Sequence, residues 1–223
     1  MPDVKEFQEL VKAGKLPAVE AALAADPSLL DATNEAGQSA FLLAKYYRQT
    51  AVAAYLLTLH PKLDFFARCA AGQTAKVLDE IDRQPEKMES HSGDGWTPLH
   101  LAAFFGHAEL AKGLLNRGAN LEARSTNAMQ NTPLHAAAAG ASVPLVSLLL
   151  EHGADANAQQ KGGWTALHAA AQSGHLEMAG VLLQHGADRA ARAENNQTPL
   201  DMALLHGRAE MALLLEPTSA REQ

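Results

Sequence analysis

Histidine is the residue type whose number and spacing most suggest chemistry in this sequence. Ten histidines occur among 223 residues, and His100, His135 and His168 each end a similar four-residue motif. A row of imidazoles could bind a metal ion or act as general bases. However, no two histidines have the His-Glu-x-x-His spacing that places two metal ligands on one helix face. A metal-binding or hydrolytic function of this row is therefore the least favoured of three functional hypotheses, and we expect no metal and no cofactor.

The single cysteine and the acidic pairs show no catalytic pattern either. Cys69 takes the place on a predicted inner helix that Ala103 takes in a later segment, which favours a buried structural thiol over a nucleophile. The chain has no Gly-x-Ser-x-Gly elbow and no glycine-rich phosphate loop, and acidic pairs such as Asp79-Glu80 are typical of a solvated surface. We therefore expect no catalytic residues and no enzyme activity.

Composition and charge exclude several classes of partner. The chain carries 18 basic and 25 acidic side chains, so its formal net charge is -7 and it lacks the basic patch of a nucleic-acid or anionic-membrane binder. No segment has the apolar length of a signal peptide or a membrane span, and one cysteine cannot build a disulfide framework. These features predict a cytoplasmic protein, expected to be a monomer.

The elements that must position these residues are repeated pairs of short helices. The motifs begin 35, 33 and 33 residues apart, and a Leu-rich run and a turn follow each of them. Threonine favours a helix N-cap and proline the first helical turn, while glycine favours the end of a helix. Helices of about eight residues are too short to persist alone, so the units must stack. The four motifs are Thr97-Pro98-Leu99-His100, Thr132-Pro133-Leu134-His135, Thr165-Ala166-Leu167-His168 and Thr198-Pro199-Leu200-Asp201.

The segment from Asp94 to Asn120 resembles the ankyrin-repeat family, and the pattern recurs through Glu216. This resemblance implies an all-α solenoid of about seven helix pairs with short β-hairpin connections. It also implies a structural role for each histidine of the row, which would bond the threonine hydroxyl of its own repeat and the backbone of a neighbouring repeat. A protein or peptide partner would then bind the hairpin tips and the concave face formed by the first helices.

The same repeat spacing divides residues 1–216 into one array, followed by a polar tail at 217–223. Repeats 5–38, 39–62 and 63–93 diverge from the pattern, repeats 94–128, 129–161 and 162–194 are regular, and 195–216 forms a C-terminal cap. The step into the third repeat is only 24 residues long. The chain there passes from a helix at 51–59 almost directly into the next helix. We therefore predict that the row of hairpins is interrupted at this point.

The scarce aromatic residues gather where the resemblance places the binding surface. Exposed aromatic side chains often anchor a protein partner. We therefore predict a non-catalytic scaffold whose binding residues include Tyr46, Tyr47, Trp96, Phe104, Phe105, Trp164, Arg124 and Gln172. The alternative is a structural or regulatory subunit, such as an inhibitor or stabiliser of an enzyme, that binds through one end of the array. Leu213 lies on the terminal unit, where a polar residue is more usual.

Overall fold

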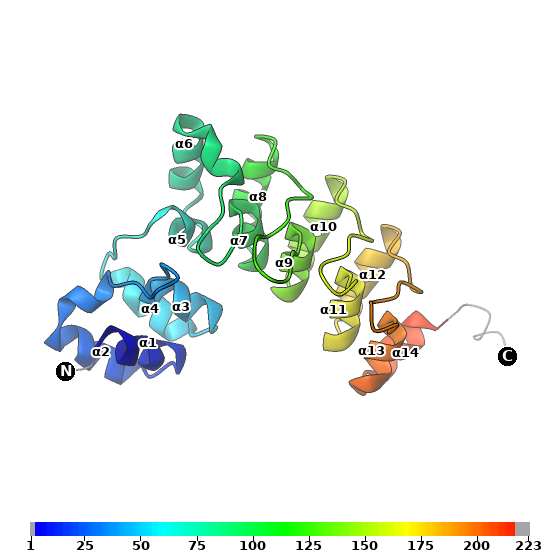
Figure 1. Cartoon of the computed structure of the whole chain (residues 1–223), viewed down its shortest axis with the longest axis horizontal. Helices are drawn as coiled ribbons and strands as arrows, with labels where there is room; N and C mark the ends of the chain where they lie inside the picture. Colours follow the sequence, from blue (N-terminus) through cyan, green and yellow to red (C-terminus); the bar gives the residue numbers. More distant parts are fainter. Residues whose placement is uncertain (1–2, 217–223) are drawn as a thin grey trace.

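The computed structural model describes residues 3–216 as an all-α stack in which consecutive helices pair in order (Figure 1). None of the helices in this range has both the length and the apolar run needed to cross a membrane. Two 3-10 turns, η1 (Pro27–Leu30) and η2 (Pro85–Glu89), follow the first and third pairs. The pairs are α1 (Val4–Lys12) with α2 (Leu16–Ala25), α3 (Ala40–Tyr46) with α4 (Thr50–Thr58), α5 (Phe65–Ala70) with α6 (Thr74–Arg83), α7 (Pro98–Phe104) with α8 (Ala108–Leu115), α9 (Pro133–Ala139) with α10 (Val143–Glu151), α11 (Ala166–Ser173) with α12 (Leu176–Gln184), and α13 (Pro199–Leu205) with α14 (Ala209–Leu215).

The first helix of each pair begins at a polar cap. Ser39 accepts a hydrogen bond from the backbone N–H of Leu42 at 3.3 Å, and Asp64 accepts one from Ala67 at 2.6 Å. Threonine occupies the N-cap of α7, α9, α11 and α13, and proline follows it in three of these four helices. The Thr97 and Thr198 hydroxyls, like Ser39 and Asp64, accept from amide groups that the first helical turn leaves unpaired, so these short helices start at a fixed residue.

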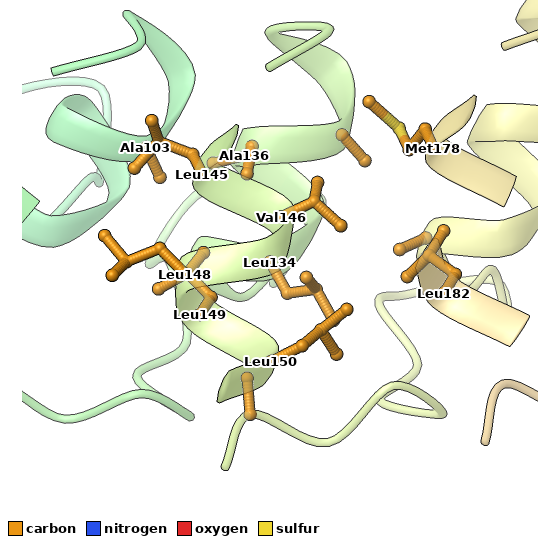
Figure 2. Packing of buried hydrophobic residues seen from close by; sticks show 14 of the residues in the cluster. Ala103, Leu134, Ala136, Leu145, Val146, Leu148, Leu149, Leu150, Met178 and Leu182 are labelled. Carbon is orange, nitrogen blue, oxygen red and sulfur yellow. The ribbon is translucent and has the colours of Figure 1, made fainter. Parts of the chain in front are cut away.

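Stacking of the pairs supplies the hydrophobic core. Alanines on the first helices, including Ala103 and Ala136, are fully buried and allow neighbouring helices to approach closely. Figure 2 shows Leu145, Leu149 and Val146 of α10 packed between the neighbouring units. Because each unit buries its apolar face against the next, no pair is an independent domain.

The core is divided at the junction between the second and third pairs. One hydrophobic cluster extends from Phe7 to Ala67 and a second from Phe65 to Leu215. The first helices stay in contact through this junction, in the order α1, α3, α5 and α7. The second helices pack as α2 with α4 and again from α6 to α14, but α4 and α6 do not form a packed pair. Residues 59–64 join α4 to α5 without a hairpin, in agreement with the short repeat spacing.

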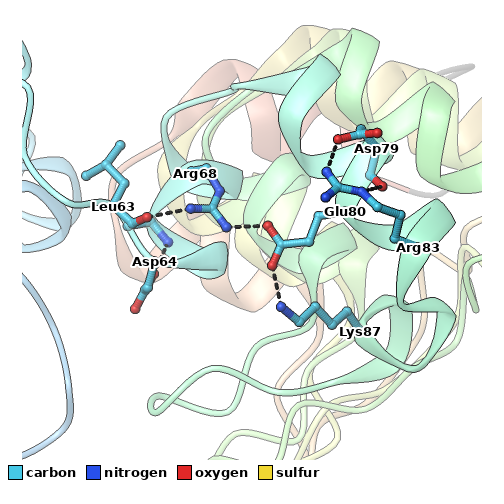
Figure 3. A network of polar contacts seen from close by, with 8 residues as sticks. Leu63, Asp64, Arg68, Asp79, Glu80, Arg83 and Lys87 are labelled. Carbon is cyan, nitrogen blue, oxygen red and sulfur yellow. Dashed lines mark hydrogen bonds and ion pairs between the residues drawn. The ribbon is translucent and has the colours of Figure 1, made fainter.

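An ion network replaces the hairpin at this junction (Figure 3). The Arg68 guanidinium donates to the carbonyl oxygen of Leu63 at 2.6 Å and also pairs with the Glu80 carboxylate. Lys87 pairs with the same carboxylate. The Lys87 hydrogen bond, together with Arg68, holds the pKa of Glu80 below its usual range. The short 59–64 connection is thus tied to α6 by charged side chains.

Candidate functional site

The histidines of the row are held by hydrogen bonds at both ring nitrogens. The Thr97, Thr132 and Thr165 hydroxyls lie 2.7, 2.8 and 2.9 Å from Nδ1 of the histidine in the same motif. Each Nε2 lies 2.9 to 3.2 Å from a carbonyl oxygen of the next hairpin. Because a carbonyl only accepts, Nε2 carries the proton and Nδ1 accepts from threonine. The row therefore joins successive units, and residues 3–216 contain no cluster of three side chains suited to a metal ion.

Burial keeps these histidines neutral. It lowers the pKa of His100 and His135 to about 4, although hydrogen bonds to the Asn131 and Trp164 carbonyls act in the opposite direction. Burial also lowers the pKa of His168. Imidazoles that stay uncharged and use both nitrogens internally are poor general bases for an external substrate.

Cys69 is equally unsuited to chemistry. Its side chain is completely buried on α5, and burial raises the pKa of the thiol. A protonated thiol without solvent access is neither a nucleophile nor a metal ligand.

Four of the predicted binding residues form one aromatic cluster. The ring of Tyr46, at the end of α3, lies with its centroid 6.0 Å from Trp96, 6.1 Å from Phe104 and 5.3 Å from Phe105. Trp96 and Phe104 meet edge to face at 4.9 Å. All four side chains are half-buried. The cluster therefore joins the second helix pair to the fourth, across the third.

The missing hairpin explains this contact. The hairpin at residues 34–38 lies directly against Gly93 of the hairpin before α7, where an added Cβ would stand 2.1 Å from the Ala36 carbonyl oxygen. Only glycine allows so close an approach at this position. Burial, with the Asp94 carboxylate as a further cause, raises the pKa of the Tyr46 phenol. The second unit thus passes over the short α5 and closes on the fourth unit.

Of the other four predicted residues, Tyr47 lines a hollow beside Tyr46 at the edge of the cluster, and the other three lie apart from it. Tyr47 is 53% exposed, with the Lys12 ammonium 5.7 Å from its ring centroid. Trp164 is half-buried against the His168 ring, and Gln172 is exposed within 3.3 Å of the His206 ring. Arg124, also exposed, donates to the carbonyl oxygens of Gln130, at 3.1 Å, and Gln159. The structure therefore brings together Tyr46, Trp96, Phe104 and Phe105, with Tyr47 at their edge. It does not bring Trp164, Gln172 and Arg124 to this cluster.

The hairpin tips form a continuous edge beside these residues. Single backbone hydrogen bonds of 2.8 to 2.9 Å connect neighbouring tips, from Thr126 to Gly95, from Lys161 to Met129 and from Glu194 to Gly162. Met129 is 50% exposed and was not among the residues predicted from sequence. In the sequence, the feature that could have indicated Met129 is the extra length of the connection that contains it, residues 124–130.

Comparison with known proteins identifies the repeats. A family model described as ankyrin repeats in three copies matches residues 7–124, 66–160 and 142–220. Over 106 residues, or 46% of this chain, the sequence is 37% identical to the human transient receptor potential cation channel subfamily A member 1. It is 31% identical over 118 residues to mouse ankyrin repeat and SAM domain-containing protein 6. Over 178 residues, or 73% of this chain, it is 26% identical to the Saccharomyces cerevisiae target of rapamycin complex 2 subunit AVO2.

The chain spans only 9%, 13% and 41% of these three proteins, so the likeness concerns the repeats. Ankyrin repeats are generally protein–protein interaction modules and are typically non-catalytic. The family model covers most of the sequence, and the helix pairs, the capped Thr-Pro-Leu-His motifs and the histidine bonds agree with it. This chain belongs to the ankyrin-repeat family.

Proposed function

We propose that this chain is a non-catalytic module that binds a protein or peptide through its concave face and hairpin tips. The observation that carries the proposal is that four first helices end in exposed side chains that stacking leaves available. These residues are Tyr47 after α3, Ala139 of α9, Gln172 of α11 and Leu205 of α13. Aromatic and large apolar side chains on a rigid surface are common anchors in protein interfaces. The internal bonding of the histidine row and the burial of Cys69 support a function without catalysis.

The aromatic cluster changes which residues best test this proposal. Substituting Tyr46 or Phe104 would disturb the packing between the second and fourth units as well as the surface. Tyr47 and Gln172 are exposed, so Tyr47→Ala with Gln172→Ala leaves the core intact. The matched control is Lys76→Ala with Glu109→Ala, two exposed residues on the second helices α6 and α8.

Quantitative affinity capture from a cell extract, followed by mass spectrometry, measures the effect. We expect the concave-face variant to lose captured proteins by about tenfold or more, at an unchanged melting temperature, because anchor residues carry most interface energy. The control variant should retain them. Equal recovery on the two variants would show that the concave face is not the binding surface.

A second candidate function is that of a structural or regulatory subunit bound through the last helix pair. Leu204, Leu205 and Leu213 are 62%, 67% and 60% exposed. Leu213 also lines a hollow of about 540 Å³, together with Leu176, Gly180 and Glu210 among other residues. The relative AVO2 is, by its name, a subunit of a complex. Leu213→Ser, at an exposed position of α14, should then abolish complex formation that Tyr47→Ala preserves.

Cytoplasmic location and a monomeric state belong to the same proposal. The location rests on the single cysteine, which favours a reducing compartment, and the monomeric state is an expectation. Sedimentation velocity of the purified chain tests the monomer.

A further inference from the structure

The junction between the second and third helix pairs leaves one face of α4 without its usual neighbour. Elsewhere in the array each second helix packs on the next, whereas α4 and α6 do not. Thr50, Ala53, Ala54 and Leu57 follow the spacing i, i+3, i+4 and i+7, so they lie on a single face of α4. In a regular array this spacing marks the face that another helix covers.

A cavity adjoins this face of α4, on the side of α7 rather than of α6. It has a volume of about 450 Å³, within the range of ligand-binding pockets. Ala71, Phe104 and Phe105 stand opposite α4, and most of the lining is apolar. We call this cavity the α4 groove, bounded by α4 at Thr50, Ala53, Ala54 and Leu57 and by Ala71 and Phe105 on the opposite side.

Two cations are the only charged residues of the groove lining. Lys45 projects from α3 with its ammonium 4.9 Å from the Phe105 ring centroid, and Arg48 reaches the Ala139 carbonyl oxygen at 3.4 Å. No carboxylate among residues 3–216 pairs with either of them. Burial lowers the pKa of Lys45, as expected for an ammonium that is partly removed from water.

This combination is unusual for the rest of the molecule. The chain carries an excess of acidic residues. Lys45 is half-buried, and the other half-buried cations of residues 3–216, namely Lys12, Arg68 and Lys87, have carboxylate partners, while Arg48 is exposed. An apolar groove with two unpaired cations at its edge is complementary to an apolar segment that brings its own carboxylate. The lining residues of α4 span two helical turns, which favours a helix as the occupant, because an amphipathic helix lays its apolar side chains along a hydrophobic groove with the same spacing.

We propose that the α4 groove binds a short amphipathic helix of a partner protein, with its apolar face on α4 and a carboxylate against Lys45 and Arg48. The inference rests on the proposed function of the chain as an interaction module and names the chemistry of one partner segment. It concerns a surface distinct from the exposed Tyr47 and Gln172, so the two can fail separately.

The test uses two synthetic helices labelled with a fluorophore. Both carry leucines at i, i+3, i+4 and i+7, flanked by glutamates in the acidic probe and by glutamines in the neutral probe. Fluorescence anisotropy with the full chain should show the acidic probe binding about tenfold more tightly or better. Lys45→Gln with Arg48→Gln should remove this difference. Lys5→Gln with Lys76→Gln, which changes the net charge equally at exposed sites, should preserve it.

A second pair of variants tests the position of the site without removing charge. Ala54 is exposed on α4, so Ala54→Trp fills the groove and should abolish binding of both probes. Ala75→Trp places the same side chain at an exposed position of α6 and should have no effect.

Three results would overturn the proposal: neither probe binds, the two probes bind equally, or Ala54→Trp retains binding. If neither helix binds but the fatty acid dodecanoate binds in this groove, the occupant is a small apolar acid and not a helix. Self-association that Ala54→Trp abolishes would instead identify a second copy as the occupant. If Ala54→Trp still captures every protein that Tyr47→Ala with Gln172→Ala loses, and the probes fail, the proposed function stands and the groove inference falls.

Discussion

Acidification is expected to destabilise this protein through the histidines that join its repeats. His100 and His135 have a folded-state pKa of about 4, lowered by burial, whereas an unfolded chain protonates histidine at a pKa of about 6.5. Between these values the unfolded state binds protons that the folded state does not. The free energy of unfolding therefore falls as the pH drops through this window, and the full contribution of the two histidines is present only above it.

The size of the effect follows from these pKa values. When the pH falls from 7 to 5, each of the two histidines lowers the free energy of unfolding by about 2 kcal/mol. Together they lower it by about 4 kcal/mol. His168 adds in the same direction, because burial lowers its pKa as well. Asp201 replaces histidine in the last motif, and its pKa is lowered because its carboxylate accepts hydrogen bonds from Thr198. Its contribution to the free energy of unfolding is therefore lost only when the pH falls below the usual pKa of aspartate. A loss of about 4 kcal/mol is a large part of the stability of a typical domain.

Urea unfolding at pH 7 and pH 5, followed by circular dichroism, measures this loss. His135→Gln removes one titrating group, so the variant should be less stable at pH 7 but should lose about 2 kcal/mol less than the natural chain on acidification. Equal unfolding free energies of the natural chain at the two pH values would refute the reasoning. So would a full pH dependence in His135→Gln.

Three further perturbations test other parts of the structure. Tyr46→Ala removes three ring contacts between the second and fourth units, so it should lower the unfolding free energy by about 2 kcal/mol. The N-terminal helix pairs should then be the first to be cut in limited proteolysis. A protease pattern like that of the natural chain would contradict this. Gly95 and Gly118 have nearly the same positive φ, +84° and +85°, but an added Cβ would lie 2.6 Å from the Asn127 nitrogen at Gly95 and meet nothing within 4 Å at Gly118. The positive φ alone should lower the unfolding free energy of each variant by about 1 kcal/mol. Because of the added clash, calorimetry should show a lower melting temperature for Gly95→Ala than for Gly118→Ala. Cys69 should react with a thiol reagent only as fast as the protein unfolds, since burial raises its pKa and removes solvent access, and rapid labelling at neutral pH in the absence of denaturant would disprove this.

Repetition explains why the sequence predicts the helix pairs so closely. The motif at Thr97 predicts a helix that begins at Pro98, and α7 spans Pro98–Phe104. The spacing predicts a helix at 51–59, and α4 spans Thr50–Thr58. Local capping and hydrophobic periodicity determine such elements. The histidine bonds are what the resemblance to ankyrin repeats implies, and they join each motif to the hairpin 29 or 31 residues further along the chain.

The contacts between non-adjacent units could not be predicted in this way. A repeat pattern specifies how a unit packs on its neighbours, and Tyr46 and Phe105 belong to units that are not neighbours. The 24-residue step indicates a missing hairpin but not the direction in which the stack closes over the gap. That direction depends on the loss of α4–α6 packing while the first helices stay in contact. For the same reason Lys45 and Arg48 have no pattern in the sequence that marks them as the edge of a groove.

The contact of the second unit with the fourth has a consequence for the order of folding. In a regular repeat array contacts are local, so folding can start in any stable segment and spread unit by unit. Here Tyr46 must meet Phe104 and Phe105, and Arg48 must meet Ala139, before the N-terminal pairs reach their final packing. During synthesis the amino-terminal pairs emerge first. They cannot complete their packing until the chain has been made as far as α9, so the Arg48 contact forms only after Ala139, 91 residues further along the chain, has been made.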